Sequence, residues 1–268
     1  MSGGSDTSLS RTVYTSKIIK AGALLADTKT MLAQWDETLS VSENLSRFRR
    51  ENIFGKASRS RIEDILRIFR QRYLTSESVT RSLVNLVRGD FPTEGLDRIL
   101  YFFTAQADLL LHDIVTETLA HFHNTGKVDV APEDIRAVIV RWLGEGKMTS
   151  KWSEDTLVRA TREILSTLRD FGILQGAAHK RLAPIYLPVE AFTYLAFYLR
   201  QRQPSGERLL DDPAWQLFFL SRQAVEHFFF EAHQYHLLEY HAAGSIIRIT
   251  FPATSMEECA YALAQRAH

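Results

Sequence analysis

The sequence predicts a mainly α, multi-helix globular protein with helix-turn-helix or winged-helix-like modules and a few short β-strands. Three observations lead to this fold class. Apolar residues recur at helical spacing through most of the 268 residues, with capping residues and glycines at the expected helix ends. Hydrophobic residues make up 45% of the chain, which is enough for a large core. Runs rich in β-branched residues are few, and Ile246–Phe251 is the clearest of them.

Changes in composition along the chain divide it into five expected parts. The first is short and polar, the next two are helical, the fourth has the element order of a winged helix, and the last is rich in aromatic residues. We expect a flexible tail over 1–12, a basic helix-turn-helix-like domain over 13–90, connecting helices over 91–127, a winged-helix-like module over 128–188, and an aromatic-rich helical region over 189–268 with a short strand at 246–251.

Apolar periodicity predicts a series of helices before residue 128. The first should cover Tyr14–Trp35, and a short one should follow Ser42. Ser58 or Ser60 should cap the next helix, which has an apolar stripe for the core. Three more helices are expected at Glu77–Val87, Glu94–Phe103 and Gln106–Phe122.

Basic residues gather between Arg47 and Arg72, where nine lysines and arginines face three acidic residues. Two basic edges beside a core-facing helix could lie along a phosphate backbone. The alternative is that these arginines pair with carboxylates from elsewhere in the fold. From this segment we expect DNA contacts by Arg47, Arg49, Arg50, Lys56, Arg59 and Arg61.

Several segments also resemble a known family in their order and spacing. They are Tyr14–Leu25, the following Trp35, Phe54–Arg61 leading to Arg67–Tyr73, and Ala243–Thr250 before a final helix. In these segments the chain is similar to the BrxA family, small core components of BREX bacteriophage-exclusion systems. The resemblance implies a largely helical, cytosolic protein that binds double-stranded DNA through helix-turn-helix features. The resemblance also implies that the protein acts together with a methyltransferase, an ATPase and other defence subunits.

Residues 128–188 have the order strand, helix, turn, helix, hairpin, which is typical of a winged helix-turn-helix module. Pro132 suits the first turn of a helix that ends at Gly144. Ser153 should cap the second helix, which runs to about Phe171 and stops at a glycine. A hairpin should then follow, with its tip at 175–181.

The second helix of this module has a basic outer face. At 100° per residue, Arg159, Arg162 and Arg169 lie opposite the apolar stripe. Guanidinium groups are permanently charged and donate to phosphate and guanine. The alternative is an ordinary solvated helix, on which arginines and carboxylates pair at i,i+4 spacing. From the module we expect DNA contacts by Lys147, Lys151, Arg159, Arg162, Arg169, Lys180 and Arg181.

Beyond the module we expect an aromatic-rich helix to about Arg202, and two or three further helices to Tyr240. Ile246–Phe251 should be an isolated strand, and Ser255 with Glu258 forms a capping box before a terminal helix. The lack of a heptad seam favours a monomer.

The charge balance and the single cysteine indicate what kind of DNA-binding surface and which cellular location to expect. A net charge of zero and a pI near 7.1 mean that any DNA-binding surface must be a local patch. Cys259 has no partner for an internal disulfide, which fits a cytoplasmic location. The most apolar stretches, Leu109–Ala120 and Leu187–Leu199, are short and interrupted by charge, so we expect no membrane insertion.

No catalytic motif stands out in the sequence. It has no phosphate-binding glycine loop, no dinucleotide fingerprint and no Gly-x-Ser-x-Gly turn. His233 and His236 with nearby histidines could hold a metal, but their aromatic neighbours favour packed histidines. We therefore expect no catalytic residue, no metal and no cofactor.

The basic surfaces predict a non-catalytic protein that binds double-stranded DNA mostly through phosphate contacts, and the resemblance to the BrxA family implies that it is a component of a BREX-type defence system. Because the expected recognition helix has no asparagine or glutamine, base readout should be limited and lean on guanine. Two alternatives remain open. The chain could be a protein–protein adaptor within the same defence complex, or a helical protein that binds RNA.

Overall fold

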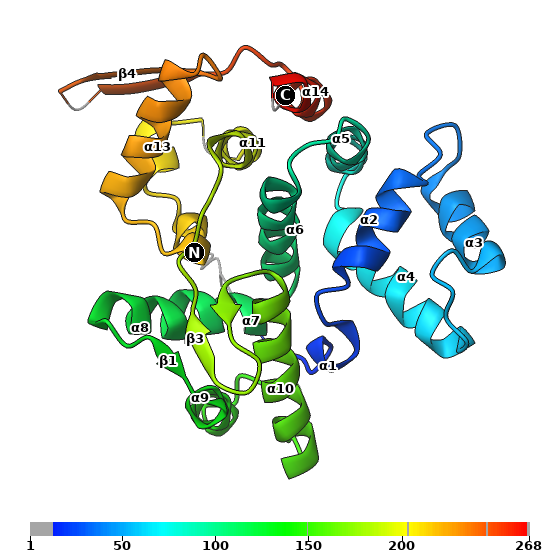
Figure 1. Ribbon diagram of the computed structural model, residues 1–268. Helices are drawn as coiled ribbons and strands as arrows, with labels where there is room; N and C mark the ends of the chain where they lie inside the picture. The colour runs from blue at the N-terminus through cyan, green and yellow to red at the C-terminus, as the bar shows by residue number, and fades with distance from the viewer. Residues whose placement is uncertain (1–12, 149, 203, 245, 267–268) are drawn as a thin grey trace, which may run out of the picture.

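The computed structural model describes residues 13–148, 150–202, 204–244 and 246–266. The mainly α fold class is confirmed, with short antiparallel strands at two places (Figure 1). The expected flexible tail, residues 1–12, lies outside the described residues. Within the described residues, no helix is long and apolar enough to pass through a lipid bilayer.

The N-terminal helices, coloured from blue to teal, lie mostly on one side of the molecule in Figure 1, with the first of them beside α10 (Glu154–Asp170). They are α1 (Ile18–Ala21), α2 (Leu25–Ala33), α3 (Val41–Glu51), α4 (Arg59–Tyr73) and α5 (Glu77–Arg88). Ser40, Ser58 and Ser76 cap the last three of them by accepting a hydrogen bond from the backbone N–H three residues on. Of the two serines considered for α4, the cap is thus Ser58.

The expectation of one helix over Tyr14–Trp35 is wrong, because the chain breaks between α1 and α2. Gly22 and Leu24 there have φ angles of 50° and 51°, outside the helical region. A Cβ on Gly22 would lie 2.7 Å from the Oε1 atom of Glu163. The break therefore lets α1 pack closely against the helix that carries Glu163.

Two longer helical runs follow in the middle of the chain. Helix α6 (Thr93–Ala107) ends at Asp108, which caps α7 (Leu109–Asp113) by accepting from the N–H of Leu111 at 3.1 Å. A π-helical turn, η1 (Ile114–Leu119), joins α7 to α8 (Ala120–Thr125). The helix expected over 106–122 is present with a later start and a π-helical middle.

The strand, the two helices and the hairpin expected over 128–188 are present, but the hairpin tip is shorter than the expected 175–181, because Gln175, Lys180 and Arg181 lie in its strands. The elements are β1 (Asp129–Val130), α9 (Pro132–Gly144), α10 (Glu154–Asp170), β2 (Leu174–Gln175) and β3 (Lys180–Leu182). The strands form one antiparallel sheet in the order β1-β3-β2. β3 ends before Pro184, which has no backbone N–H to donate to a sheet ladder.

The C-terminal third differs most from expectation. It contains α11 (Val189–Arg200), α12 (Gly206–Leu210), the 3₁₀ helix η2 (Pro213–Phe218), α13 (Arg222–Gln234), β4 (Glu239–Ala243), β5 (Ile246–Thr250) and α14 (Met256–Arg266). Helices to Tyr240 were expected, but α13 ends six residues earlier and the chain turns at His236, whose φ is 55°. The strand expected to be isolated therefore pairs with β4 along its whole length.

One continuous core links all of these elements. Helices α6 and α11 are buried over most of their surfaces and lie centrally in Figure 1, and α14 packs on α5. Phe192 of α11 stacks on Trp215 and Phe228 at centroid distances of 4.7 and 4.9 Å. Aromatic packing of this kind joins α11, η2 and α13 in the core of the last third.

Candidate nucleic-acid interface

A groove of about 550 Å³ lies on the outer side of α10. Three elements form it: the beginning of α9, the middle of α10, and the hairpin tip between β2 and β3. Four basic side chains line the groove, together with one acidic residue, Glu133. The basic residues are Arg136, Arg162, Arg169 and Lys180. The groove thus collects positive charge from segments more than 40 positions apart in the chain.

Arg136 was not among the residues expected from the sequence to contact DNA. It lies on the outer side of α9, and both oxygens of Glu154 accept from its Nη2 atom, at 2.6 and 2.8 Å. This ion pair joins the first turn of α10 to α9. A pairing across 18 positions leaves no periodic signal, so the sequence offered no means of finding it.

Arg162 is the basic side chain of α10 most available to a ligand. It is exposed and forms no hydrogen bond or ion pair with any residue that the structure describes. Arg169 contacts the carboxylate of Asp170 at 2.6 Å, and Arg159 is 3.6 Å from Asp155. Such exposed pairs contribute little and exchange easily, so both arginines can turn to another anion.

Lys180 stabilises the hairpin tip by donating hydrogen bonds to its backbone. Lys180 donates from Nζ to the carbonyl oxygen of Gly176 at 2.8 Å, and also to that of Ala177. Gly176 has a φ of 94°, and a Cβ there would lie 2.0 Å from the carbonyl oxygen of His179, so only glycine fits. Arg181 does not line the groove, because it pairs with Asp129 across the sheet at 3.2 Å.

The link between α9 and α10 carries the other two expected residues. Lys147 pairs with Glu145 at 3.1 Å, and Lys151 is exposed beyond it. Neither lines the groove. The N-terminal segment holds this link in place, since the N–H of Tyr14 donates to the carbonyl oxygen of Lys147 at 2.8 Å. The Tyr14 ring packs on Trp142 at a centroid distance of 4.8 Å.

Replacing Tyr14 with phenylalanine tests this attachment. The Tyr14 hydroxyl donates to Asp113 at 2.6 Å, and burial and this hydrogen bond raise the pKa of Tyr14 above its ordinary value. We expect Tyr14→Phe to lower the free energy of unfolding by about 1–3 kcal/mol, the usual loss for a hydrogen bond to a charged group. Urea denaturation measures it, with Tyr186→Phe, at an exposed tyrosine, as the control. Equal stability of both variants would contradict this role.

The expected N-terminal patch is largely engaged in pairs within the protein. Arg49 contacts Glu63 at 2.5 Å and Lys56 contacts Asp27 at 3.2 Å. Arg47 and Arg50 both lie near Glu51, at 3.9 and 3.3 Å. Arg61 donates to the carbonyl oxygen of Lys20 at 2.7 Å, and Arg59 is exposed at the start of α4. These pairs reduce the positive field of the segment.

We therefore expect the N-terminal patch to add little to DNA affinity. Replacing Arg47, Arg49 and Arg50 together with glutamine should weaken duplex binding by no more than about threefold, because none of the three lines the basic groove and their charges are opposed by Glu51 and Glu63. The slope of affinity against salt should stay as in the unmodified protein, since few phosphate contacts are lost. A fall in that slope by two or more would show that the patch lies on the DNA.

The candidate metal ligands do not come together. Because α13 ends before His236, that residue does not share a helix face with His233. The rings of His233 and His241 are 5.7 Å apart between centroids. Within the described part of the chain, no three His, Cys, Asp or Glu side chains are arranged to hold a metal ion. Cys259 is buried, and burial raises the pKa of its thiol to about 12, as expected for a core residue.

A family model described as BrxA matches residues 12–198, which span the N-terminal helices, the groove and the start of the C-terminal third. No match was found among curated proteins.

Proposed function

This chain belongs to the BrxA family, and on that premise we propose that it is a non-catalytic, double-stranded DNA-binding component of a BREX-type defence system. Membership of the family supports the association with BREX defence. The observation that supports DNA binding most strongly is the convergence of Arg136, Arg162, Arg169 and Lys180 on one groove. We further propose that the protein acts as a cytoplasmic monomer.

The arrangement around this groove supports a winged helix. The elements follow one another in the order α8, β1, α9, α10 and the β2–β3 hairpin. The three strands form one sheet in the order β1-β3-β2. In this order α10 is the recognition helix and the hairpin is the wing.

The side chains of the groove favour backbone contacts over base readout. Helix α10 carries no asparagine or glutamine, so it lacks the usual partners of adenine. Its arginines can donate to phosphate, and also to guanine where α10 lies close to base edges in the DNA major groove. We therefore propose binding that depends little on sequence and strongly on ionic strength.

A binding titration at several salt concentrations tests the proposal. If all four basic residues of the groove contact phosphate, log K should fall against log salt with a slope of about −3 to −4. A duplex RNA of the same sequence should bind more weakly, because its deep, narrow major groove excludes a helix. Absence of binding at low salt would favour an adaptor, and tighter binding to RNA would favour the RNA-binding alternative.

An adaptor role has one specific observation in its favour. Four large apolar side chains of the C-terminal third are exposed: Phe230 by 49%, Tyr235 by 61%, Ile246 by 72% and Tyr261 by 63%. Exposed aromatic residues are common where proteins meet. We propose this region for contacts to other BREX subunits, such as the methyltransferase or the ATPase. Copurification with those subunits, lost on replacing Ile246 and Tyr261 with serine, is the expected result.

A further inference from the structure

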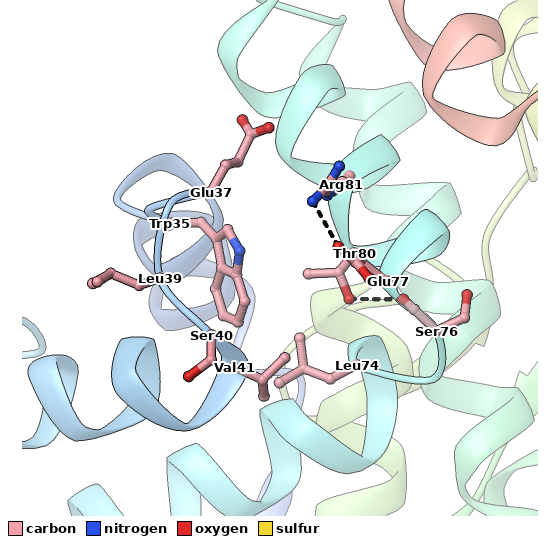
Figure 2. Close-up of a pocket in the computed structure, with 10 residues that line it drawn as sticks. All are labelled: Trp35, Glu37, Leu39, Ser40, Val41, Leu74, Ser76, Glu77, Thr80 and Arg81. Atoms are coloured by element: carbon pink, nitrogen blue, oxygen red, sulfur yellow. Dashed lines mark hydrogen bonds and ion pairs between the residues drawn. The ribbon is translucent and has the colours of Figure 1, made fainter.

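A second cavity, of about 410 Å³, opens between α3 and α5 (Figure 2). It lies among the N-terminal helices and shares no lining residue with the basic groove of α10. Trp35 forms one wall, Arg81 and Thr80 of α5 lie opposite, and Val41 and Leu74 supply apolar surface. The cavity is independent of the proposed DNA-binding surface.

The indole of Trp35 brings an unused hydrogen-bond donor to this cavity. The residue is only 5% exposed, with its ring packed near Phe48 and Phe69 at centroid distances of 6.1 Å. Figure 2 shows the ring nitrogen on the edge that faces Thr80 and Arg81 across the cavity. The indole N–H has no partner among the residues that the structure describes. The ring is buried but its nitrogen is not fully enclosed, so the N–H is open to the cavity and can donate to a ligand that brings an oxygen.

The surroundings favour a negatively charged acceptor. Helix α3 begins at Val41 and helix α5 at Glu77, so the positive ends of two helices meet at the cavity. Arg81 adds a guanidinium, whose Nη2 atom is 2.6 Å from Glu77 and whose other nitrogens have no described partner. A guanidinium can hold two carboxylates at once through different N–H groups.

The acidic residues at the rim do not turn the cavity into a cation site. Glu77 is 75% exposed and paired with Arg81, and Glu37 is paired with Arg88 at 2.9 Å. The hydroxyl of Thr80 is also engaged, since it donates to backbone carbonyl oxygens of Tyr73 and Ser76. With both carboxylates in ion pairs, the donors without a described partner are the indole N–H of Trp35 and the remaining nitrogens of Arg81, beside apolar surface.

We propose that this cavity binds a carboxylate carried on a short apolar stem. The carboxylate accepts from the indole N–H of Trp35 and from the guanidinium of Arg81, while the stem packs on Val41 and Leu74. Two sources carry this chemistry: a small free carboxylic acid, and the C-terminal carboxylate of a peptide that ends in an apolar residue.

Nuclear magnetic resonance of the full chain, labelled with ¹⁵N at its four tryptophans, tests the proposal. The probes are butyrate, for the free acid, and acetyl-Ala-Ala-Val, for the peptide end. Each is titrated at constant ionic strength up to roughly 50 mM, which covers millimolar dissociation constants. The indole resonance of Trp35, assigned with Trp35→Phe, should shift in saturable fashion while those of Trp142, Trp152 and Trp215 stay in place. Tighter binding of butyrate would identify the ligand as a small free acid, and tighter binding of the peptide would identify it as a peptide C-terminus.

Uncharged and charge-matched controls make the test specific. Butyramide and the amidated peptide should leave the Trp35 resonance unmoved, because they lack the carboxylate. Arg81→Gln should weaken probe binding by about tenfold or more, the loss expected for a charge-assisted hydrogen bond. Arg70→Gln, which removes an exposed arginine of α4 outside the cavity, should leave binding within about twofold. No saturable shift with either probe, equal shifts with the amides, or equal affinity in Arg81→Gln would overturn the proposal.

Discussion

Replacing Arg162 and Arg169 together with glutamine is expected to weaken binding to duplex DNA by about 30-fold or more. Each lost contact of an arginine to phosphate or guanine costs about 1–3 kcal/mol, and two lost contacts add when they act independently. Arg162 has no competing partner among the described residues, and the pair of Arg169 with Asp170 is exposed. Fluorescence anisotropy with a labelled duplex measures the change, and the slope of affinity against salt should become shallower by about two.

A matched variant separates a local effect from a loss of overall charge. Arg208 and Arg248 are exposed in the C-terminal third, so Arg208→Gln with Arg248→Gln changes the net charge equally away from the groove. Its affinity for DNA should stay within about twofold of the unmodified protein, because distant exposed charges are screened. If both double variants bind equally well, the groove on α10 is not where DNA lies.

The elements around the groove could be predicted because their limits are marked by local residues. Ser153 caps α10 by accepting from the N–H of Thr156 at 3.3 Å, and Pro132 stands at the first turn of α9. Gly172 follows α10 with a φ of 70°, as its place after the helix indicates. Signals of this kind act within a few residues, so they are readable in a single sequence.

The partners of the basic residues could not be predicted in the same way. The acid that meets Lys56 is Asp27, which lies 29 positions away in α2, and the acid that meets Arg136 is 18 positions away. Counting local charges therefore overstated the free charge of the N-terminal patch and missed Arg136. The β4–β5 hairpin was missed for a related reason. Tyr240 is held there by Glu226 of α13 at 2.6 Å, a tertiary contact that outweighs local helix propensity.

The second large expected effect concerns stability and depends on a buried arginine of α6. Arg98 is only 6% exposed, and its guanidinium donates to the carbonyl oxygens of Phe171 at 2.5 Å and Tyr186 at 2.9 Å. These two residues flank the β2–β3 hairpin, so one side chain joins the central helix to both ends of that segment. Burial lowers the pKa of Arg98 below its ordinary value, because the charged guanidinium loses contact with solvent.

We expect Arg98→Met to lower the free energy of unfolding by about 2–5 kcal/mol. The substitution keeps much of the side-chain volume but leaves two carbonyl oxygens without their donor, at about 1–3 kcal/mol each. Relief from burying a charge offsets part of the loss. Glu94→Gln is the control, because Glu94 is half-exposed and 3.8 Å away, and should change stability by less than about 0.5 kcal/mol. Urea denaturation gives the totals, and hydrogen exchange should rise first between Phe171 and Tyr186. If Arg98→Met instead costs no more than the control, the hairpin is held by apolar packing alone, and its position beside α10 does not depend on this arginine.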